Sequence, residues 1–413
     1  MSTSIIHSAS ACASITLASL LSLPAVADLP QHPAVAGFGP TLSECCPDGE
    51  PLFHEAQFGY AVAIRNGIAF ISIPSGLPTA RVAVFNQTAT GWARTATLTP
   101  PDAASESRFG RAIAFRDGLV LIASEAAVHV FKRIGGVWTA IQKLTPPDAR
   151  EFPTALALRY ENGILAIGSR GGGTLGNVAF IYELNSNGKF VKRATLEPAD
   201  GAPNGGFGDD VGVAGNAVVV GAPGENAAYV FKRRSDGKWV ETQKLSTAER
   251  AGGGFGSAVA IDRGMIVVGA PGFDCQGGAY CGPSPHIAGG AAFVFVSIAG
   301  RYAEVLKLRP RPDEHPGYYD FGYRISMFDK YIVVAANEPY GYIDAHPRGY
   351  AFTYTRDGAS VLARGFASGY ITARSIGLAN NLLLVGSPRD DFRCGNTEGC
   401  TGNATLFDLN RYR

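Results

Sequence analysis

The side chains best suited to binding chemistry lie toward the C-terminal end of the chain, where tyrosines, histidines and carboxylates share a few loop-like segments. Functional residues concentrate on loops held by a rigid scaffold, and aromatic faces beside carboxylates suit stacking and hydrogen bonding to a sugar or a peptide. The candidate ligand-binding residues are Tyr280, His286, Tyr318, Tyr319, Asp320, Tyr340, Tyr342, Asp344 and His346. The alternative is that these aromatic side chains only cover the apolar edges of long loops.

The same segments supply candidates for catalysis. Paired carboxylates at separations of about 5–10 Å are sufficient for glycoside hydrolysis, and Asp320, Asp344 and His346 are the residues available. The chain has no Gly-x-Ser-x-Gly, no His-Glu-x-x-His and no phosphate-loop motif. No His-x-x-His or Cys-x-x-Cys spacing accompanies His286 or His346, which favours surface histidines over metal ligands. We therefore predict a site without catalytic or metal-ligating residues, and keep a polysaccharide hydrolase or lyase as the alternative.

The scaffold that holds these segments is predicted from an internal sequence repeat. Residues 207–224 and 255–272 have nearly the same sequence, and the Phe-Gly pair that begins them recurs at Phe58, Phe109 and Phe321. A two-residue turn begins eight positions after each start, and two degenerate copies begin with Thr-Ala. The copies start near 58, 109, 154, 207, 255, 321 and 372. This spacing indicates a repeat architecture rather than separate domains.

Each repeat predicts four antiparallel strands. Asn66-Gly67 and Asp117-Gly118 are typical of primed hairpin turns, which need positive φ. The second strand is nearly all apolar, and in three copies it ends in Gly-Ala-Pro or Gly-Ser-Pro, where proline has no N–H for the ladder. The third strand carries alternating aromatic residues, and the fourth leads into a Pro/Asp linker. This pattern predicts an all-β, seven-bladed β-propeller, with the repeated phenylalanines in the core and the glycines admitting the neighbouring blade.

The two ends of the chain are predicted to close the ring. The seventh copy stops after its third strand, so we expect residues 37–46 to supply the fourth strand and to remove an open edge. The predicted domains are a signal peptide over 1–27 and one propeller over 28–413, with the closing strand and linker in 28–57. Residues 1–27 have no charged side chain and end in Ala25-Val26-Ala27, a small-residue cleavage site. We therefore expect a secreted or periplasmic protein cleaved near Ala27.

Six cysteines follow the predicted cleavage site, an even number that is consistent with an oxidising compartment. Cys275 and Cys281 lie close together in one loop and are expected to pair. The others, Cys45, Cys46, Cys394 and Cys400, are expected at the seam of the ring. Either at least one disulfide joins the closing strand to the seventh blade, contributing about 2–4 kcal/mol, or a local Cys394–Cys400 bond forms beside a vicinal Cys45–Cys46 bond.

Phe-Gly followed by Gly-Ala-Pro resembles the FG-GAP repeat, the unit of the integrin α-chain propeller and of many secreted bacterial proteins. The best matches are Phe255-Gly256 with Gly269-Ala270-Pro271 and Phe207-Gly208 with Gly221-Ala222-Pro223. The resemblance implies a propeller and, in some members, calcium bound by an Asp-x-Asp-x-Asp-Gly loop between the two motifs. Here a two-residue turn takes that place, and calcium needs six to eight oxygen ligands, so we expect no cofactor. Asp209-Asp210 and Asp390-Asp391 are weak calcium candidates, and solvated carboxylates are the favoured interpretation.

The direction of the strands predicts which face of this propeller can bind. The turns inside each hairpin share one face, whereas the opposite face receives the long connections 272–290, 337–348 and 389–402 and the linker 309–320. A net charge of +1 gives no argument for nucleic acid or a membrane surface. We therefore expect a binding or adhesion module for a glycan or protein partner, acting through loops of blades five to seven. A purely structural envelope component is a further alternative, and the oligomeric state stays open.

Overall fold

The computed structural model describes the strands of the propeller and the short turns that join them. The described residues are 41–42, 57–74, 80–102, 108–125, 127–145, 155–169, 177–202, 205–247, 253–273, 289–309, 319–337, 349–357, 360–369, 374–388 and 402–412. The predicted signal segment, the six cysteines and most of the long connections lie outside these ranges.

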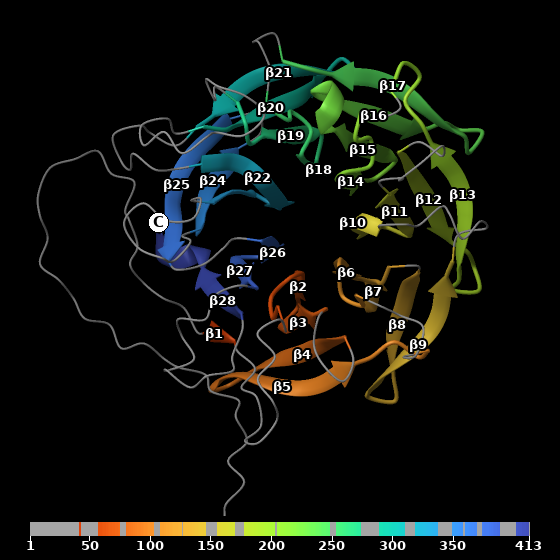
Figure 1. The fold of residues 1–413 in the computed structure, drawn as a ribbon, viewed down its shortest axis with the longest axis vertical. Helices are drawn as coiled ribbons and strands as arrows, with labels where there is room; N and C mark the ends of the chain where they lie inside the picture. The colour runs from red at the N-terminus through yellow and green to blue at the C-terminus, as the bar shows by residue number, and fades with distance from the viewer. Residues whose placement is uncertain are drawn as a thin grey trace, which may run out of the picture.

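The strands form seven four-stranded antiparallel sheets arranged in a ring (Figure 1). Blade one holds β2 (Val62–Arg65), β3 (Ile68–Ile73), β4 (Arg81–Thr88) and β5 (Gly91–Leu98). Blade two holds β6 (Ile113–Arg116), β7 (Leu119–Ala123), β8 (Val128–Ile134) and β9 (Val137–Leu144). Blade three holds β10 (Ala155–Glu161), β11 (Ile164–Ser169), β12 (Val178–Leu184) and β13 (Phe190–Leu196).

Blade four holds β14 (Val211–Ala214), β15 (Ala217–Ala222), β16 (Ala227–Arg233) and β17 (Trp239–Leu245). Blade five holds β18 (Ala258–Asp262), β19 (Met265–Ala270), β20 (Ala291–Ile298) and β21 (Arg301–Leu308). Blade six holds β22 (Tyr319–Phe328), β23 (Tyr331–Asn337), β24 (Gly349–Asp357) and β25 (Ser360–Gly369). Blade seven holds β26 (Ser375–Ala379), β27 (Leu382–Ser387), β28 (Asn403–Asp408) and β1 (Thr41–Leu42). The predicted all-β, seven-bladed fold is confirmed.

Tight turns set the register of the inner hairpins. Asn66 and Gly67 have φ of 50° and 70°, and Asp117 and Gly118 have φ of 53° and 73°. Positive φ at both central residues matches the twist of the flanking strands, as expected for primed turns. The second strands end where proline was predicted to stop them, since β15 and β19 stop directly before Pro223 and Pro271.

The glycines of the repeat allow neighbouring blades to touch backbone to backbone. A Cβ added to Gly221, in the Gly-Ala-Pro of blade four, would lie 2.0 Å from the carbonyl oxygen of Gly256 in blade five. Gly256 has a φ of 101° and itself lies against the carbonyl of Ala227. The same contact joins Gly386 of blade seven to Gly59 of blade one. The repeated Phe-Gly and Gly-Ala-Pro motifs are therefore two halves of one inter-blade contact.

The repeated phenylalanines are core residues, as predicted. The rings that are no more than 2% exposed include Phe58, Phe109, Phe207, Phe255 and Phe321. In blade four, Phe207 meets Phe231 of the third strand edge to face with centroids 6.0 Å apart. Phe255 and Phe295 repeat this arrangement in blade five at 6.1 Å. Such pairs contribute about 0.5–1.5 kcal/mol beyond area burial, so the motif stabilises each blade as well as the contact between blades.

The two ends of the ring meet in the seventh sheet. β1 pairs antiparallel with β28, with Thr41 opposite Thr405, and this strand falls within the segment 37–46 from which a closing strand was expected. Figure 1 shows β1 beside β28, at opposite ends of the colour scale. A core cluster that contains Phe58, Ala379 and Leu406 then joins blade one to blade seven.

Two short 3-10 helices are the exceptions to strand and turn in the described part. η1 (Pro223–Glu225) follows β15, and η2 (Leu409–Tyr412) follows β28. Both are too short to change the architecture. Across the described ranges, no helix has the length and apolar character needed to cross a membrane.

Candidate functional site

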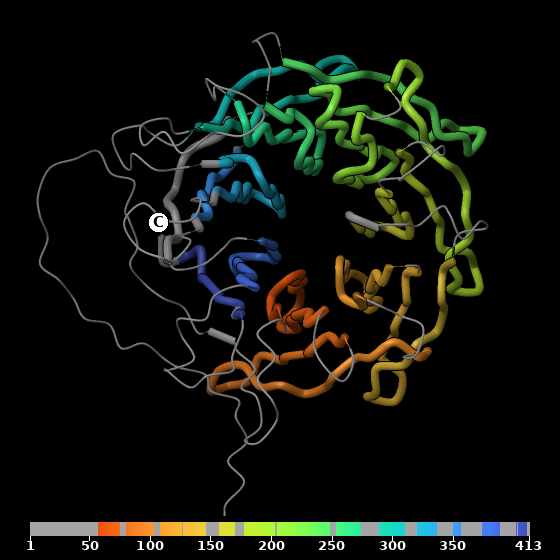
Figure 2. The backbone as a smooth tube through the Cα atoms, in the orientation of Figure 1, coloured from red at the N-terminus to blue at the C-terminus, as the bar shows by residue number. Residues whose placement is uncertain are grey.

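The first strands of the blades surround the axis of the ring (Figures 1 and 2), and a cavity opens at each end of them. The cavity at their starts, called the channel mouth below, has a volume of about 190 Å³. Its polar lining is Tyr60, Arg111, Arg159, Asp209, Asp210, Arg324, Arg374 and Ser375. Each first strand starts opposite the end of its antiparallel neighbour. The mouth therefore lies on the face that receives the connections between second and third strands, the face predicted to bind.

Arg374 organises one side of the channel mouth. Its Nη2 donates to Tyr60 Oη at 2.7 Å, and its Nη1 donates to Tyr323 Oη at 3.1 Å. The guanidinium carbon also lies 4.5 Å from the centroid of the Tyr60 ring, in a cation–π contact. A phenol oxygen that accepts a hydrogen bond keeps its own O–H, so the hydroxyl of Tyr60, a residue of the mouth, can still donate to a ligand.

Further guanidinium groups converge on the mouth from other blades. Arg324 stacks on Tyr323 at 4.1 Å and donates to the backbone carbonyl of Tyr323 at 3.0 Å. On blade two, Nη1 of Arg111 is shielded from solvent and has no hydrogen-bond partner among the described residues. A charged donor without a protein partner is satisfied by an acceptor such as a bound water, an ion or a ligand oxygen. The mouth therefore has the donors of an oxyanion site.

Positive charge dominates the electrostatics here. Burial by itself raises the pKa of Tyr60, but the charges of Arg374, Arg111 and Arg324 and the hydrogen bond from Arg374 together hold that pKa below its ordinary value. Burial likewise disfavours the charged form of Arg374, yet Tyr323 and Tyr60 outweigh it and raise the pKa of Arg374. The phenolate and the guanidinium therefore stabilise each other.

This balance can be tested by titration. In Arg374→Gln, we expect the pKa of Tyr60 to rise, because burial then opposes a weaker positive field. Ultraviolet titration of the phenolate checks this, with Tyr60→Phe in each background to isolate the signal of Tyr60. An unchanged pKa would contradict the assigned role of Arg374.

Asp210 contradicts the solvated interpretation of the Asp209-Asp210 pair. It is 7% exposed, and its Oδ1 and Oδ2 accept the backbone N–H groups of Val211 at 3.0 Å and Val259 at 2.9 Å. Oδ1 also lies 3.5 Å from Nη2 of Arg159. The carboxylate is buried because it satisfies N–H groups at the starts of two neighbouring inner strands. It links blades three, four and five.

The cavity at the opposite end of the channel is larger, about 610 Å³, but most of its charged side chains are already paired. Arg116 lies 2.8 Å from Glu161, Arg263 lies 2.7 Å from Asp329, and Arg356 binds Asp262. Burial raises the pKa of Glu161 despite the attraction of Arg116. Paired groups offer less to an incoming ion, so the channel mouth is the stronger candidate.

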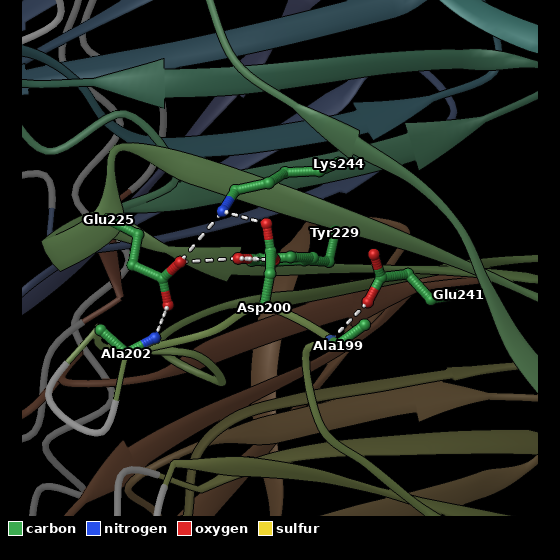
Figure 3. Close-up of polar contacts among 7 residues, drawn as sticks. All are labelled: Ala199, Asp200, Ala202, Glu225, Tyr229, Glu241 and Lys244. Atoms are coloured by element: carbon green, nitrogen blue, oxygen red, sulfur yellow. Dashed lines mark hydrogen bonds and ion pairs between the residues drawn. The ribbon is translucent and has the colours of Figure 1, made fainter.

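A polar network in blade four has a structural role (Figure 3). Tyr229 donates to Glu225 at 2.6 Å, and Lys244 lies 3.2 Å from Glu225 and 3.1 Å from Asp200. Burial raises the pKa of Tyr229, and the hydrogen bond to Glu225 raises it further, so the phenol stays a neutral donor. Lys143 and Asp102 repeat the lysine–aspartate contact in blade two at 3.1 Å. The network fastens the linker between blades to the outer strands.

Most of the predicted ligand-binding residues lie outside the described part of the chain. These are Tyr280, His286, Tyr318, Tyr340, Tyr342, Asp344 and His346. Tyr319 begins β22, where its backbone pairs with Asn337. Asp320 follows with an exposed side chain and a φ of 57°. The proposed pairing of Cys275 with Cys281, and the alternatives for Cys45, Cys46, Cys394 and Cys400, also lie outside the described ranges and stay predictions.

The residues of the channel mouth were missed, although the repeat contains their signal. The position directly after Phe-Gly holds Tyr60, Arg111 and Tyr323, and after the degenerate Thr-Ala it holds Arg374. In five of the seven repeats this position is aromatic or charged, whereas blades three and five have Leu156 and Ser257 there. Tyr60, Arg111, Asp209 and Arg374 line the mouth from four different blades, so they gather only when the ring closes.

Metal ligands do not gather around these residues. In the portion of the chain that the structure places, no group of three or more His, Cys, Asp and Glu side chains could hold a metal ion. Both carboxylate oxygens of Asp210 already accept hydrogen bonds.

Comparisons with known proteins agree with this architecture. Residues 190–231 and 239–295 match the family model described as FG-GAP repeat. No curated protein matches the sequence. Among solved structures, a chain of the mitotic checkpoint complex is 11% identical with a TM-score of 0.52, covering 94% of this chain and 99% of that one. A protein from Lactobacillus plantarum is 12% identical with a TM-score of 0.47, covering 75% of this chain and 88% of that one. At this identity, the likeness to the checkpoint-complex chain indicates a shared fold alone. This chain is therefore a seven-bladed β-propeller in which residues 190–231 and 239–295 match the FG-GAP repeat.

Proposed function

We propose that the protein is a secreted or periplasmic binding module that holds an acidic group of an extracellular glycan or protein partner in the channel mouth. The observation that carries the proposal is the convergence of Arg111, Arg324 and Arg374 with the hydroxyl of Tyr60 on one open cavity. Guanidinium groups and phenol hydroxyls are donors that match carboxylate, sulfate or phosphate oxygens. The long connections on the same face would supply the rest of the contact surface.

The surroundings of the tyrosine rings favour binding of a charged group over stacking of a sugar on the rings. Arg374 lies against the ring of Tyr60, and Arg324 lies against the ring of Tyr323. A ring face that carries a guanidinium group is not available to a sugar. The hydroxyls and the free guanidinium donors therefore dominate the recognition in the mouth.

The test is a glycan array of neutral, uronate-containing and sulfated glycans, followed by calorimetry with the acidic glycan that binds best. Arg111→Gln should weaken that binding roughly 10- to 100-fold, because a hydrogen bond between charged groups contributes about 1.5–3 kcal/mol. Binding should also fall as salt is raised.

The matched control is Arg133→Gln, which removes the same charge from the exposed outer part of blade two. Equal losses in the two variants would place the binding site elsewhere. Binding that is insensitive to EDTA is expected, because we propose that recognition needs no calcium. Binding to neutral glycans alone would overturn the proposal.

A further inference from the structure

We infer that the channel mouth can also cleave a uronate-containing glycan by β-elimination, with Tyr60 taking the C5 proton and Arg111 holding the carboxylate. The inference rests on the proposed function, because the acidic group that the mouth binds would be the carboxylate of the uronate. It names a reaction and a substrate class beyond binding.

The position of Tyr60 suits a base. Tyr60 lines the open cavity, and its hydroxyl accepts the hydrogen bond from Arg374 at 2.7 Å. The same guanidinium is fixed on its other side by Tyr323 at 3.1 Å, and Arg324 donates to the backbone carbonyl of Arg374 at 3.3 Å. Arg374 and Tyr323 therefore act as positioning residues that hold the phenol and stabilise its phenolate.

The carboxylate of a uronate makes the adjacent C5 hydrogen acidic only if the developing charge is stabilised. Arg111 lines the mouth, and because one nitrogen of its guanidinium group has no hydrogen-bond partner among the described residues, the group has donor capacity for that carboxylate. Fixed donors directed at oxygens that gain charge in the transition state are a main source of catalysis. Arg111, Arg324 and Arg374 also lower the pKa of Tyr60, which increases the fraction present as phenolate.

The reaction balances without a further reactant. The Tyr60 phenolate takes the C5 proton, the C5–H electron pair forms the C4=C5 double bond, and the C4–O4 bond breaks. The departing O4 oxygen then takes the proton from Tyr60, which returns to its phenolate. One glycan chain becomes two, one of which ends in an unsaturated uronate, and no oxidant, water or metal is consumed.

In this mechanism Tyr60 both removes the C5 proton and returns it to O4, and this restricts which uronates can react. The C5 hydrogen and the C4 oxygen must then lie on the same face of the sugar ring. Glucuronate and mannuronate have this geometry, whereas galacturonate and guluronate have the two groups on opposite faces. The mouth, at about 190 Å³, is smaller than the roughly 300–1,000 Å³ of typical ligand pockets, which suits a single sugar residue.

Hydrolysis is less compatible with the same geometry. It requires an acid and a second carboxylate on opposite sides of the glycosidic bond. Among the described residues, the carboxylates that line the mouth are Asp209 and Asp210, neighbours on one wall. Both oxygens of Asp210 already accept backbone hydrogen bonds.

The experiment incubates the full chain with glycans of glucuronate, mannuronate, galacturonate and guluronate and follows the ultraviolet absorbance of the conjugated double bond. Binding is measured in parallel by calorimetry. We expect turnover of a glucuronate or mannuronate glycan, with Tyr60→Phe lowering kcat about 10²- to 10⁴-fold while the affinity falls only about 10-fold, the cost of one lost hydroxyl hydrogen bond. Tyr302→Phe, on the outer strand of blade five, is the control and should leave both unchanged.

The role of Arg374 has its own readout. In Arg374→Gln, the rising limb of the pH–rate profile should move to higher pH, because the phenolate is less stabilised. Binding without absorbance on any of the four glycans would overturn the elimination and leave the proposed function standing. Absence of binding to any acidic ligand would overturn both. Turnover of galacturonate or guluronate alone, or turnover unaffected by Tyr60→Phe, would refute Tyr60 as the single base.

Discussion

Gly221→Ala is expected to destabilise the propeller by about 3 kcal/mol, the upper end of the usual cost of overpacking. The new Cβ would lie 2.0 Å from the carbonyl oxygen of Gly256. That oxygen cannot withdraw, because the Gly256 N–H binds Gly269 at 2.9 Å and the Cα side of Gly256 lies against the Ala227 carbonyl. Two blades would therefore have to separate, and the phenylalanine core between them would loosen.

The measurement is the thermal unfolding midpoint by calorimetry, with Gly215→Ala as the control. Gly215 lies in the inner hairpin turn of the same blade with a φ of 58°, and a Cβ there would meet nothing within 4 Å. Its substitution should cost only the strain of a left-handed residue, about 1–2 kcal/mol. If Gly221→Ala were no worse than this control, the backbone contact would not limit the stability of the ring.

Asp210→Ala is expected to cost about 3 kcal/mol of folding free energy. The substitution leaves the N–H groups of Val211 and Val259 without their acceptor, and each buried unsatisfied group costs about 1–3 kcal/mol. It also removes the anion that faces Arg159 at 3.5 Å, so the contact among three blades is lost at one point. Denaturant unfolding with matched slopes would measure the difference.

Asp236→Ala provides the comparison. Its carboxylate also accepts a backbone N–H, that of Lys238 at 3.0 Å, but in an exposed turn where water can take its place. We expect a loss below about 1 kcal/mol there. Similar losses in the two variants would mean that the burial of Asp210 contributes nothing, and would restore the solvated interpretation.

The predictions for Gly221 and Asp210 differ in how far the sequence alone could have led to them. Gly221 could be chosen from the sequence, because the glycine recurs at one position of each Gly-Ala-Pro motif and the repeat fixes its place. Asp210 could not, since an acidic pair is usually exposed. Its partner Val259 is 49 positions away, in the next blade. A repeat shows which positions of different blades are equivalent. It does not show which residues found in only one copy contact each other.

The sequence by itself determined the blades. Turn residues such as Asn66-Gly67, apolar second strands and the Phe-Gly glycines act over a few positions, so their pattern predicts local structure, and repetition of that structure predicts the ring. Tertiary structure alone decided the channel mouth. Tyr60 and Arg374 are 314 positions apart, yet share a hydrogen bond because closure brings blade seven against blade one. The net charge around the axis is the sum of side chains contributed by every blade. A sequence pattern that spans a few positions therefore cannot predict it.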